Sequence, residues 1–451
     1  YKSKDEYHIG LIAKKLLFDQ GEKNAFYSIK TAIGKNINAL LMFENAQPIE
    51  KSFESIARDY IDKLIKNLII KSGINYDNFI FTHPTKLENK SFNVFKKIVK
   101  DVVYKYQPQC SNIEFYDEAT SAAMGVLENF ANENSSVLVY DFGGGTTDIV
   151  YANISSNIEL DPLTDDELVN FYIVPKKFRG YQIGGDDINR IIIEEIIEFY
   201  YKKDAIIIPY LNIYEYKPIN WNLTTIKKIN YNIGRLWRFS EIIKRNIFNE
   251  NLKFFESQAV DVYACSGSFN IPETWSFDKE NKLYVTSIFN NLGNSDFDFN
   301  KFKIKIFGKV YEKLKKCIDA TTSILSSTKN LDNSENITLV LTGKASQFPL
   351  VKDIFYYYKG ILDSIEFKEK YNFLPDDCSC SLENVKIETR LNSGKLKSVV
   401  AQGAYKLFAN KNINIQSILT YDVFINSSKI EEGSIKVSNG HLASIIRKHD
   451  K

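Results

Sequence analysis

The chain has 451 residues, of which 44% are hydrophobic and 25% charged, and its formal net charge is +2. This composition is that of a folded globular protein, and the length exceeds what one hydrophobic core usually holds, so two or more lobes are expected. The small net charge gives no reason to expect nucleic-acid binding, and no apolar run reaches the roughly 20 residues of a membrane span.

The first part of the chain, residues 1–131, mixes helix-type and strand-type patterns. Apolar residues recur at helical spacing in two segments, and a run of small residues favours a third helix. The helices expected from these patterns span 49–72, 91–106 and 118–130. Two β-rich runs predict short strands, and these span 78–82 and 113–116.

A strand–turn–strand pattern follows, and its turn is rich in glycine. The segment Asp141-Phe142-Gly143-Gly144-Gly145-Thr146-Thr147-Asp148 separates two β-type runs, 136–140 and 149–154. Glycine adopts positive φ without steric cost, so such a turn can direct several backbone N–H groups into one concavity of phosphate size. A carboxylate at the strand end can hold a hydrated divalent cation. The pattern therefore predicts a nucleotide site.

Beyond this hairpin the chain alternates between helix-type stretches and short β-type runs. Residues 161–169 are acidic and are expected to form a loop, whereas Gly184-Gly185 are expected to lead into a helix. The further helices expected are 231–246, 301–326, 350–358 and 397–409, with a strand at 337–341. Short β-type runs are expected within 256–300 and again after residue 410.

Other glycine-rich nucleotide motifs fit the hairpin less well. A P-loop or a dinucleotide-binding fingerprint requires a helix directly after the glycines, whereas a strand is expected here. The segment Asp141-Phe142-Gly143 matches the magnesium motif of protein kinases, but the chain has no His-Arg-Asp catalytic loop. A plain glycine turn without a ligand stays open as an alternative.

Five further segments occur in one order along nearly the whole chain. They are Phe26–Gly34, Phe81–Pro84, Tyr116–Ala123, Ile183–Asn189 and Glu241–Arg245. Together with the hairpin, which is similar to a second phosphate loop, they resemble the ATPase domain of the seventy-kilodalton heat-shock chaperones. The resemblance implies a two-lobed α/β fold of the actin-like ATPase superfamily, with duplicated ribonuclease-H-like sheets and the start of a C-terminal β-domain.

The resemblance also implies roles in ATP hydrolysis with Mg²⁺. Lys30 would orient the attacking water, while Glu118 and Asp141 would hold magnesium-bound waters. Thr146 and Asp148 would help to place water and metal. The residues expected to bind ATP or ADP are Gly143, Gly144, Gly145, Thr147, Gly184, Gly185, Glu241, Lys244, Arg245 and Gly343. Taken singly, Lys30 could be an exposed helix lysine and Glu118 an acid favoured by the helix dipole.

Several positions depart from the family pattern. Lys344 and Gln347 replace a glycine and the arginine that stacks on adenine, and Lys397 stands where the family has an aspartate. The family's first phosphate loop lies upstream of the lysine segment, so the chain is expected to begin after it. With these departures, both a slow ATPase and a protein without ATPase activity remain as alternatives.

The resemblance divides the chain into a nucleotide-binding domain over 1–412, an interdomain linker over 413–424 and part of a β-domain over 425–451. The expected lobes are 1–131 with 395–412, and 132–394. Nucleotide state would set the angle between lobes and act through the linker on co-chaperones, an exchange factor and unfolded or client polypeptides. Five scattered cysteines favour a reducing compartment, so a cytoplasmic location is expected.

Two other functions stay open beside a chaperone-type ATPase. The changed base-binding positions are also what a chaperone-like scaffold without turnover would carry. An actin-like filament ATPase is a further alternative. It is disfavoured by the pair Glu241 and Lys244 and by the β-type tail.

Overall fold

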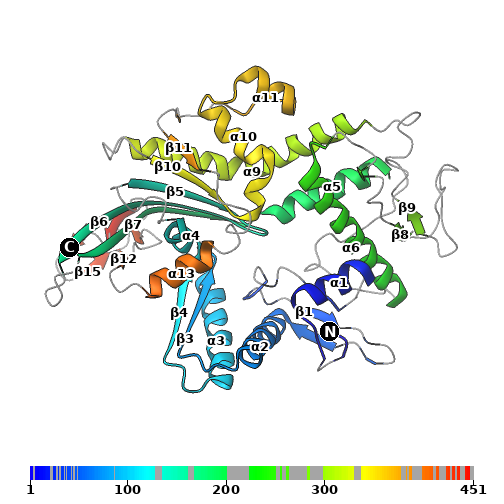
Figure 1. Cartoon of the computed structure of the whole chain (residues 1–451), viewed down its shortest axis with the longest axis horizontal. Coiled ribbons are helices and arrows are strands. Elements are labelled where there is room, and N and C mark those ends of the chain that lie inside the picture. The colour runs from blue at the N-terminus through cyan, green and yellow to red at the C-terminus, as the bar shows by residue number, and fades with distance from the viewer. Residues whose placement is uncertain are drawn as a thin grey trace.

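The computed structural model of the chain is a mixed α/β structure built around a six-stranded sheet (Figure 1). It describes residues 1–3, 6–20, 24–26, 29, 32–34, 36, 38–41, 43, 46–47, 49–85, 87–126, 135–160, 167–200, 223–249, 254–255, 261–263, 282–284, 298–329, 337–376, 382, 385–388, 399–409, 413–415, 423–426, 429–431, 434–436 and 442–446. All structural statements below concern these residues. The expected α/β class is confirmed.

The six-stranded sheet has the order β11-β10-β5-β6-β7-β12. Its strands are β5 (Ser135–Phe142), β6 (Thr147–Leu160), β7 (Glu167–Tyr181), β10 (Ile337–Thr342), β11 (Val385–Glu388) and β12 (Ile413–Ile415). The middle three strands form an antiparallel meander, while β10 runs parallel to β5 and β12 runs parallel to β7. The glycine-rich hairpin expected from the sequence is therefore confirmed as β5–β6.

The prediction of an acidic loop over 161–169 is wrong for its last three residues, which belong to strand β7. Strand β6 continues to Leu160, and β7 begins at Glu167, which pairs with it in the antiparallel ladder. Residues 161–166 lie outside the described part of the chain. Ladder pairing with a long neighbouring strand thus outweighs the low strand propensity of acidic residues.

Alternating side chains of the sheet bury its two faces against different helices. Leu138, Tyr140 and Phe142 belong to the larger core, whereas Val137 and Val139 belong to the core on the opposite face. The helices of the larger core are α5 (Gly185–Tyr200), α6 (Leu223–Asn246), α9 (Phe299–Lys329), α10 (Pro349–Tyr358) and α11 (Ser364–Tyr371). The opposite face is covered by α4 (Glu118–Val126) and α13 (Val399–Ala409). Both faces of the central strands are therefore dry, as their continuous apolar sequences require.

A smaller unit precedes the sheet in the sequence. Its strands β3 (Asn78–His83) and β4 (Asn112–Asp117) pair in parallel and are connected through α3 (Asn89–Tyr106). Helix α2 (Phe53–Ser72) packs with them in a separate core. The helix expected at 49–72 is wrong in its first turn, because Ile49–Ser52 forms strand β2, which pairs with β1 (Asn38–Leu41). The Ser52 hydroxyl accepts a hydrogen bond from Ser55 N and so fixes the helix start at Phe53.

The other expected elements are confirmed, with bounds that differ at their ends. Helix α6 begins at Leu223, eight residues before the expected start at 231. Helix α4 is described only to Val126, and residues 127–134 lie outside the described part. Helix α1 (Gly10–Gln20) and the short 3-10 helix at Lys344–Gln347 had no sequence signal that we recognised. The remaining short strands are β8 (Asp261–Tyr263), β9 (Lys282–Tyr284), β13 (Val423–Asn426), β14 (Lys429–Glu431), β15 (Ser434–Lys436) and β16 (Leu442–Ile446).

Helices α4 and α13 cross in close backbone contact between the two units (Figure 1). A Cβ on Gly403 would collide with the Ser121 carbonyl oxygen, and a Cβ on Gly125 would collide with the Val399 carbonyl oxygen. Glycine at these two positions is what lets the helices approach. None of the helices in the described part of the chain is both long and apolar enough to cross a membrane.

Candidate functional site

Three glycine-containing turns meet at one end of the six-stranded sheet. The tip of the β5–β6 hairpin lies against the turn that precedes α5, where Gly185 N donates to Gly143 O at 2.9 Å and Asp186 N donates to Gly144 O at 2.7 Å. The third turn begins at Gly343, directly after β10, whose end is paired in register with the end of β5. Sheet register thus brings together turns that are far apart in sequence.

Close backbone contact requires glycine at two of these positions. A Cβ on Gly184 would collide with the carbonyl group of Gly144. Gly343 has φ 80°, and a Cβ there would collide with Asp141 Oδ1 and the Phe142 carbonyl. Any other residue would therefore push the three turns apart.

The hairpin glycines themselves differ from what the sequence led us to expect. Neither Gly143 nor Gly144 has φ in the left-handed region, so the expected positive φ is wrong for these two residues. Gly143 N donates to Thr146 O at 2.9 Å and closes the tip. Gly144 is exposed, and a Cβ on it would meet nothing within 4 Å. At Gly144 the missing side chain leaves open space in front of the backbone, which is what the approach of a ligand to the backbone requires.

The two threonines of the hairpin have different environments. Thr147 is fully buried, and its Oγ1 donates to Ile183 O at 2.7 Å, so it ties the hairpin to the turn before α5. Thr146 and Gly145 are half-buried at the tip. The Thr147 hydroxyl is therefore used in a hydrogen bond within the protein.

Two carboxylates of the hairpin lie directly opposite each other. Asp141 and Asp148 are partners in the antiparallel register, and their exposed fractions are 9% and 2%. Opposite residues of such a pair project from the same face of the sheet, and like charges there repel. Asp148 Oδ1 also accepts a hydrogen bond from Thr85 N at 3.2 Å, which connects the hairpin to the end of β3.

Residues that the sequence analysis missed connect the hairpin to α4. Thr85 Oγ1 donates to Asp117 Oδ1 at 3.3 Å, and the same oxygen of Asp117 accepts from Thr120 N at 2.8 Å. Asp117 therefore caps α4 and positions Glu118, the first residue of that helix. An aspartate between a strand and a run of small residues is a helix-start signal that could have identified Asp117.

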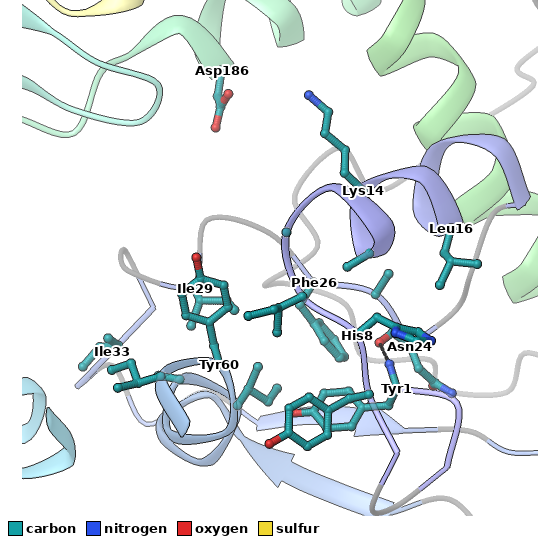
Figure 2. Close-up of a pocket in the computed structure, with 18 of the residues that line it drawn as sticks. Tyr1, His8, Lys14, Leu16, Asn24, Phe26, Ile29, Ile33, Tyr60 and Asp186 are labelled. Atoms are coloured by element: carbon teal, nitrogen blue, oxygen red, sulfur yellow. Dashed lines mark hydrogen bonds between the residues drawn. The ribbon is translucent and has the colours of Figure 1, made fainter. Parts of the chain in front are cut away.

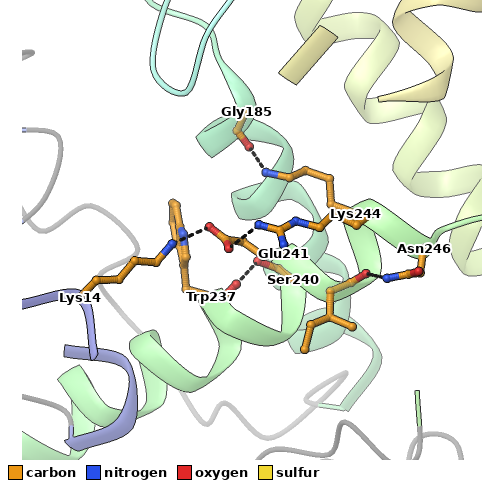
Figure 3. Close-up of polar contacts among 9 residues, drawn as sticks. Lys14, Gly185, Trp237, Ser240, Glu241, Lys244 and Asn246 are labelled. Carbon is orange, nitrogen blue, oxygen red and sulfur yellow. Dashed lines mark hydrogen bonds and ion pairs between the residues drawn. The ribbon is translucent and has the colours of Figure 1, made fainter. Parts of the chain in front are cut away.

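The residues of α6 that the resemblance assigns to adenosine binding have partners within the protein (Figure 3). Glu241 Oε1 pairs with Lys14 Nζ at 3.3 Å, and Glu241 Oε2 pairs with Arg245 Nη2 at 3.3 Å. Lys244 Nζ donates to Gly185 O at 3.1 Å. Burial lowers the pKa of Lys244 to about 8, and the nearby carboxylates Glu241 and Asp186 offset this effect only in part.

A cavity of about 630 Å³ opens beside these residues. The residues that line it include Lys14, Glu118, Asp186, Trp237 and Glu241. Figure 2 shows Lys14 and Asp186 directed toward the same open space, with the Tyr60 hydroxyl below them. The volume lies within the range of small-molecule sites, which is about 300–1,000 Å³. Two of the expected site residues, Glu118 and Glu241, thus line the same cavity.

Lys30, the expected catalytic lysine, lies outside the described residues, as does Lys397. The residues present fit a phosphate group at the hairpin tip, because Gly144 leaves its backbone open. They also fit a hydrated cation beside Asp141 and Asp148, since Mg²⁺ commonly binds one or two carboxylates and keeps several waters. A cluster of three or more metal-ligating side chains does not occur in the described part of the chain.

Comparison with protein-family models finds no family that matches the chain. Comparison with curated proteins finds no match either.

Proposed function

We propose that the chain is the nucleotide-binding part of a chaperone-type ATPase with the two-lobed actin-like arrangement. The observation that carries this proposal is the junction of the β5–β6 hairpin tip with the turn before α5, beside the opposed pair Asp141 and Asp148. An open backbone turn and two carboxylates at the end of a sheet are the parts needed to bind a phosphate together with a hydrated divalent cation.

The phosphate groups of ATP or ADP would bind at Gly144, Gly145 and Thr146. The first amides of α5 contribute less, because Gly185 N and Asp186 N already donate to the hairpin. Their role is to hold the tip in place, so that its remaining backbone groups are fixed before a ligand arrives. Preorganised donors of this kind need little rearrangement on binding, which favours affinity.

Mg²⁺ would bind through water to Asp141 and Asp148. When bound it supplies positive charge that offsets the repulsion between these two carboxylates and the charge of the phosphates. Thr85 and Asp117 keep Asp148 and Glu118 in position through the hydrogen bonds described above. Lys30 would complete this group of residues as the resemblance implies.

We propose weak discrimination between nucleotide bases. Lys244 donates to Gly185 O, and Glu241 pairs with Lys14 and Arg245, so a nucleoside in contact with these side chains would compete with existing contacts. Lys344 and Gln347 remove the groups that the family uses to stack and surround adenine. Phosphate recognition would then dominate affinity, and ATP and GTP would bind within about tenfold of each other, a difference of about 1.4 kcal/mol.

Strand β12 supports a coupling role for the expected linker. Ile413–Ile415, the first residues of the segment expected to be a linker, pair in parallel with Phe171–Ile173 of β7. The other end of β7 is paired with Thr147 of the hairpin. A change at the nucleotide site could therefore reach the linker through one strand. Co-chaperones, an exchange factor and client polypeptides in the cytoplasm are the partners that this role implies.

Calorimetric titration of the full-length protein with ATP in the presence of Mg²⁺ tests the proposal. We expect saturable binding that Asp141→Asn weakens at least tenfold and that Asp101→Asn, an exposed aspartate on α3, leaves unchanged. The absence of ATP and ADP binding in the unaltered protein would reject the proposal.

A chaperone-like scaffold that does not hydrolyse ATP is the alternative. The changed residues at the expected base-binding positions, Lys344, Gln347 and Lys397, favour it. It predicts nucleotide binding without hydrolysis, so steady phosphate release that Asp141→Asn abolishes would exclude it. ATP-dependent sedimentation of the protein would instead support the filament-forming alternative.

A further inference from the structure

Thr342, the last residue of β10, has a fully buried side chain whose hydroxyl group has no hydrogen-bond partner among the described residues. By contrast, the buried hydroxyl groups of Thr147 and Ser346 each donate to a backbone carbonyl. Buried hydroxyl groups ordinarily have such a partner, because an unpaired one forfeits the hydrogen bonds that it makes with water. The exception at Thr342 therefore calls for a specific explanation.

The sheet register places Thr342 beside the carboxylate pair Asp141 and Asp148. Thr342 is the register partner of Asp141 in the parallel pair β10–β5, and Asp141 is the partner of Asp148 in the antiparallel pair β5–β6. Val340 and Val139, two residues earlier on β10 and β5, belong to the core beneath α4 and α13. Since alternate side chains of a strand share a face, Thr342 and the two aspartates project from that face as well. Three oxygen-bearing side chains thus form one row across three neighbouring strands.

Backbone contacts hold both carboxylates of this row in place. A Cβ on Gly343, the residue after Thr342, would collide with Asp141 Oδ1, so this oxygen lies against the end of β10. On the other side of the row, Asp148 Oδ1 accepts a hydrogen bond from Thr85 N at 3.2 Å. The three side chains are therefore fixed by neighbouring strands and turns before any ligand binds.

A hydroxyl group next to two carboxylates suits a hydrated divalent cation. Carboxylates attract such a cation and accept hydrogen bonds from its waters. A threonine hydroxyl can accept from one more of these waters while it donates its own proton to a carboxylate. A water molecule alone would also pair the hydroxyl, but it would leave the repulsion between the two opposed carboxylates as it is. A hydrated cation answers both requirements.

We infer that Thr342 is a positioning residue of the cation site, whose hydroxyl group holds a cation-bound water and so sets the affinity for the divalent ion beside Asp141 and Asp148. The inference rests on the cation site of the proposed function and uses none of its nucleotide contacts. It adds a residue from β10, which is far in sequence from the hairpin and was not among the expected site residues.

Binding of Mn²⁺ in the absence of nucleotide tests this inference. Mn²⁺ prefers the same oxygen ligands as Mg²⁺, and the free ion is quantified by its electron paramagnetic resonance signal. Thr342→Val removes the hydroxyl group and should weaken Mn²⁺ binding about tenfold, as the loss of a group that orients metal ligands commonly does. Thr342→Ser keeps the hydroxyl group and should bind Mn²⁺ as the unaltered protein does. The matched control is Thr338→Val, on the same face of β10 but paired with Val137, and it should leave the affinity unchanged.

Thermal unfolding in the presence of a chelator gives a second readout. Without a cation, Thr342→Val should unfold at the same temperature as the unaltered protein or at a higher one, because an unpaired buried hydroxyl group is costly. Circular dichroism establishes that the variants are folded, and if Thr342→Val is not, Thr342→Ala is compared with Thr342→Ser, since these two also differ in a hydroxyl group.

The outcomes separate this inference from the proposed function. Equal Mn²⁺ affinity of Thr342→Val and the unaltered protein would overturn the inference, even where ATP binds in the calorimetric titration. A lower unfolding temperature of Thr342→Val in chelator would also overturn it, because the hydroxyl group would then be paired within the protein. Binding of Mn²⁺ that depends on Thr342, in a protein that binds neither ATP nor ADP, would support the inference and reject the proposed function.

Discussion

Lys14 on α1 and Glu241 on α6 are 227 residues apart in sequence, and their charged atoms lie 3.3 Å apart where both side chains line the cavity. The pair connects α1 to the helix that carries Lys244. Both side chains keep substantial exposure, 48% for Lys14 and 23% for Glu241, so solvent screens their attraction. The pair therefore contributes little to stability, although it joins two helices that lie in contact.

The first prediction concerns the strength of this ion pair. A double-mutant cycle with Lys14→Ala and Glu241→Gln should give a coupling free energy of about 0.2–1 kcal/mol, the range of exposed pairs. The coupling should fall as salt is added, because the Debye length is only about 10 Å at 0.1 M ionic strength. Urea denaturation at two salt concentrations measures it. Lys15→Ala, at the next residue of α1, serves as the control, and a coupling of zero at low salt would contradict the prediction.

The second prediction separates two glycines of the candidate site. Gly184→Ala should destabilise the protein by about 1–3 kcal/mol, because its Cβ would collide with the Gly144 carbonyl. Gly144→Ala should change stability by less than about 0.5 kcal/mol, since the space in front of it is open. We expect Gly144→Ala nevertheless to weaken nucleotide binding. Denaturation and calorimetry on both variants check this, and a Gly144→Ala protein with unchanged nucleotide affinity would remove the hairpin tip from the site.

The third prediction concerns the crossing of α4 and α13. Gly403→Ala should cost about 1–3 kcal/mol, because the new methyl group would collide with the backbone of α4. Gly308→Ala is the matched control within α9, where a Cβ meets nothing within 4 Å, and it should stabilise by about 0.5–1 kcal/mol. Thermal or urea unfolding of both variants measures the difference. A Gly403→Ala protein as stable as the unaltered one would mean that the helices can separate freely.

The fourth prediction concerns the titration of Lys244. Burial lowers the pKa of its ammonium group from 10.5 to about 8 in the folded protein, so between these values the unfolded state binds more protons. Stability relative to Lys244→Met should therefore rise as pH increases from 8 to 10.5, and should be independent of pH below 8. Urea denaturation of both proteins across this range tests the direction. A relative stability that falls with pH would indicate that the amine is not desolvated.

The fifth prediction concerns magnesium alone. If Asp141 and Asp148 share a hydrated cation, Mg²⁺ should raise the unfolding temperature of the unaltered protein, because a ligand that binds only the folded state stabilises it. Asp148→Asn should reduce that shift. Differential scanning fluorimetry with and without a chelator measures it, and Asp101→Asn is the control. Equal shifts in all three proteins would locate the magnesium effect elsewhere.

The sequence was most informative where a local pattern and the tertiary environment agree. Strands β5 and β10 are buried on both faces, and their continuous apolar runs predicted them correctly. Helix α3 was predicted to within a few residues because its apolar positions recur at helical spacing. Helix α11 was missed although Asp363 and Glu366 form a capping box, a local signal that we did not use. Strand β7 was not among the expected elements, because pairing along β6 rather than its own composition determines where it begins.

For the candidate site, the sequence by itself determined which chemical groups are available: the glycines of the hairpin, Asp141 and Asp148, and the polar side chains near the end of α6. Local sequence contains this information because turn geometry and the alternation of a strand depend on neighbouring residues. Only the tertiary structure decided that the Thr147 hydroxyl is used internally, that Thr85 supports Asp148 and that Lys14 reaches Glu241. These contacts depend on sheet register and helix packing, which arise from many weak interactions between distant parts of the chain, so no local pattern specifies them.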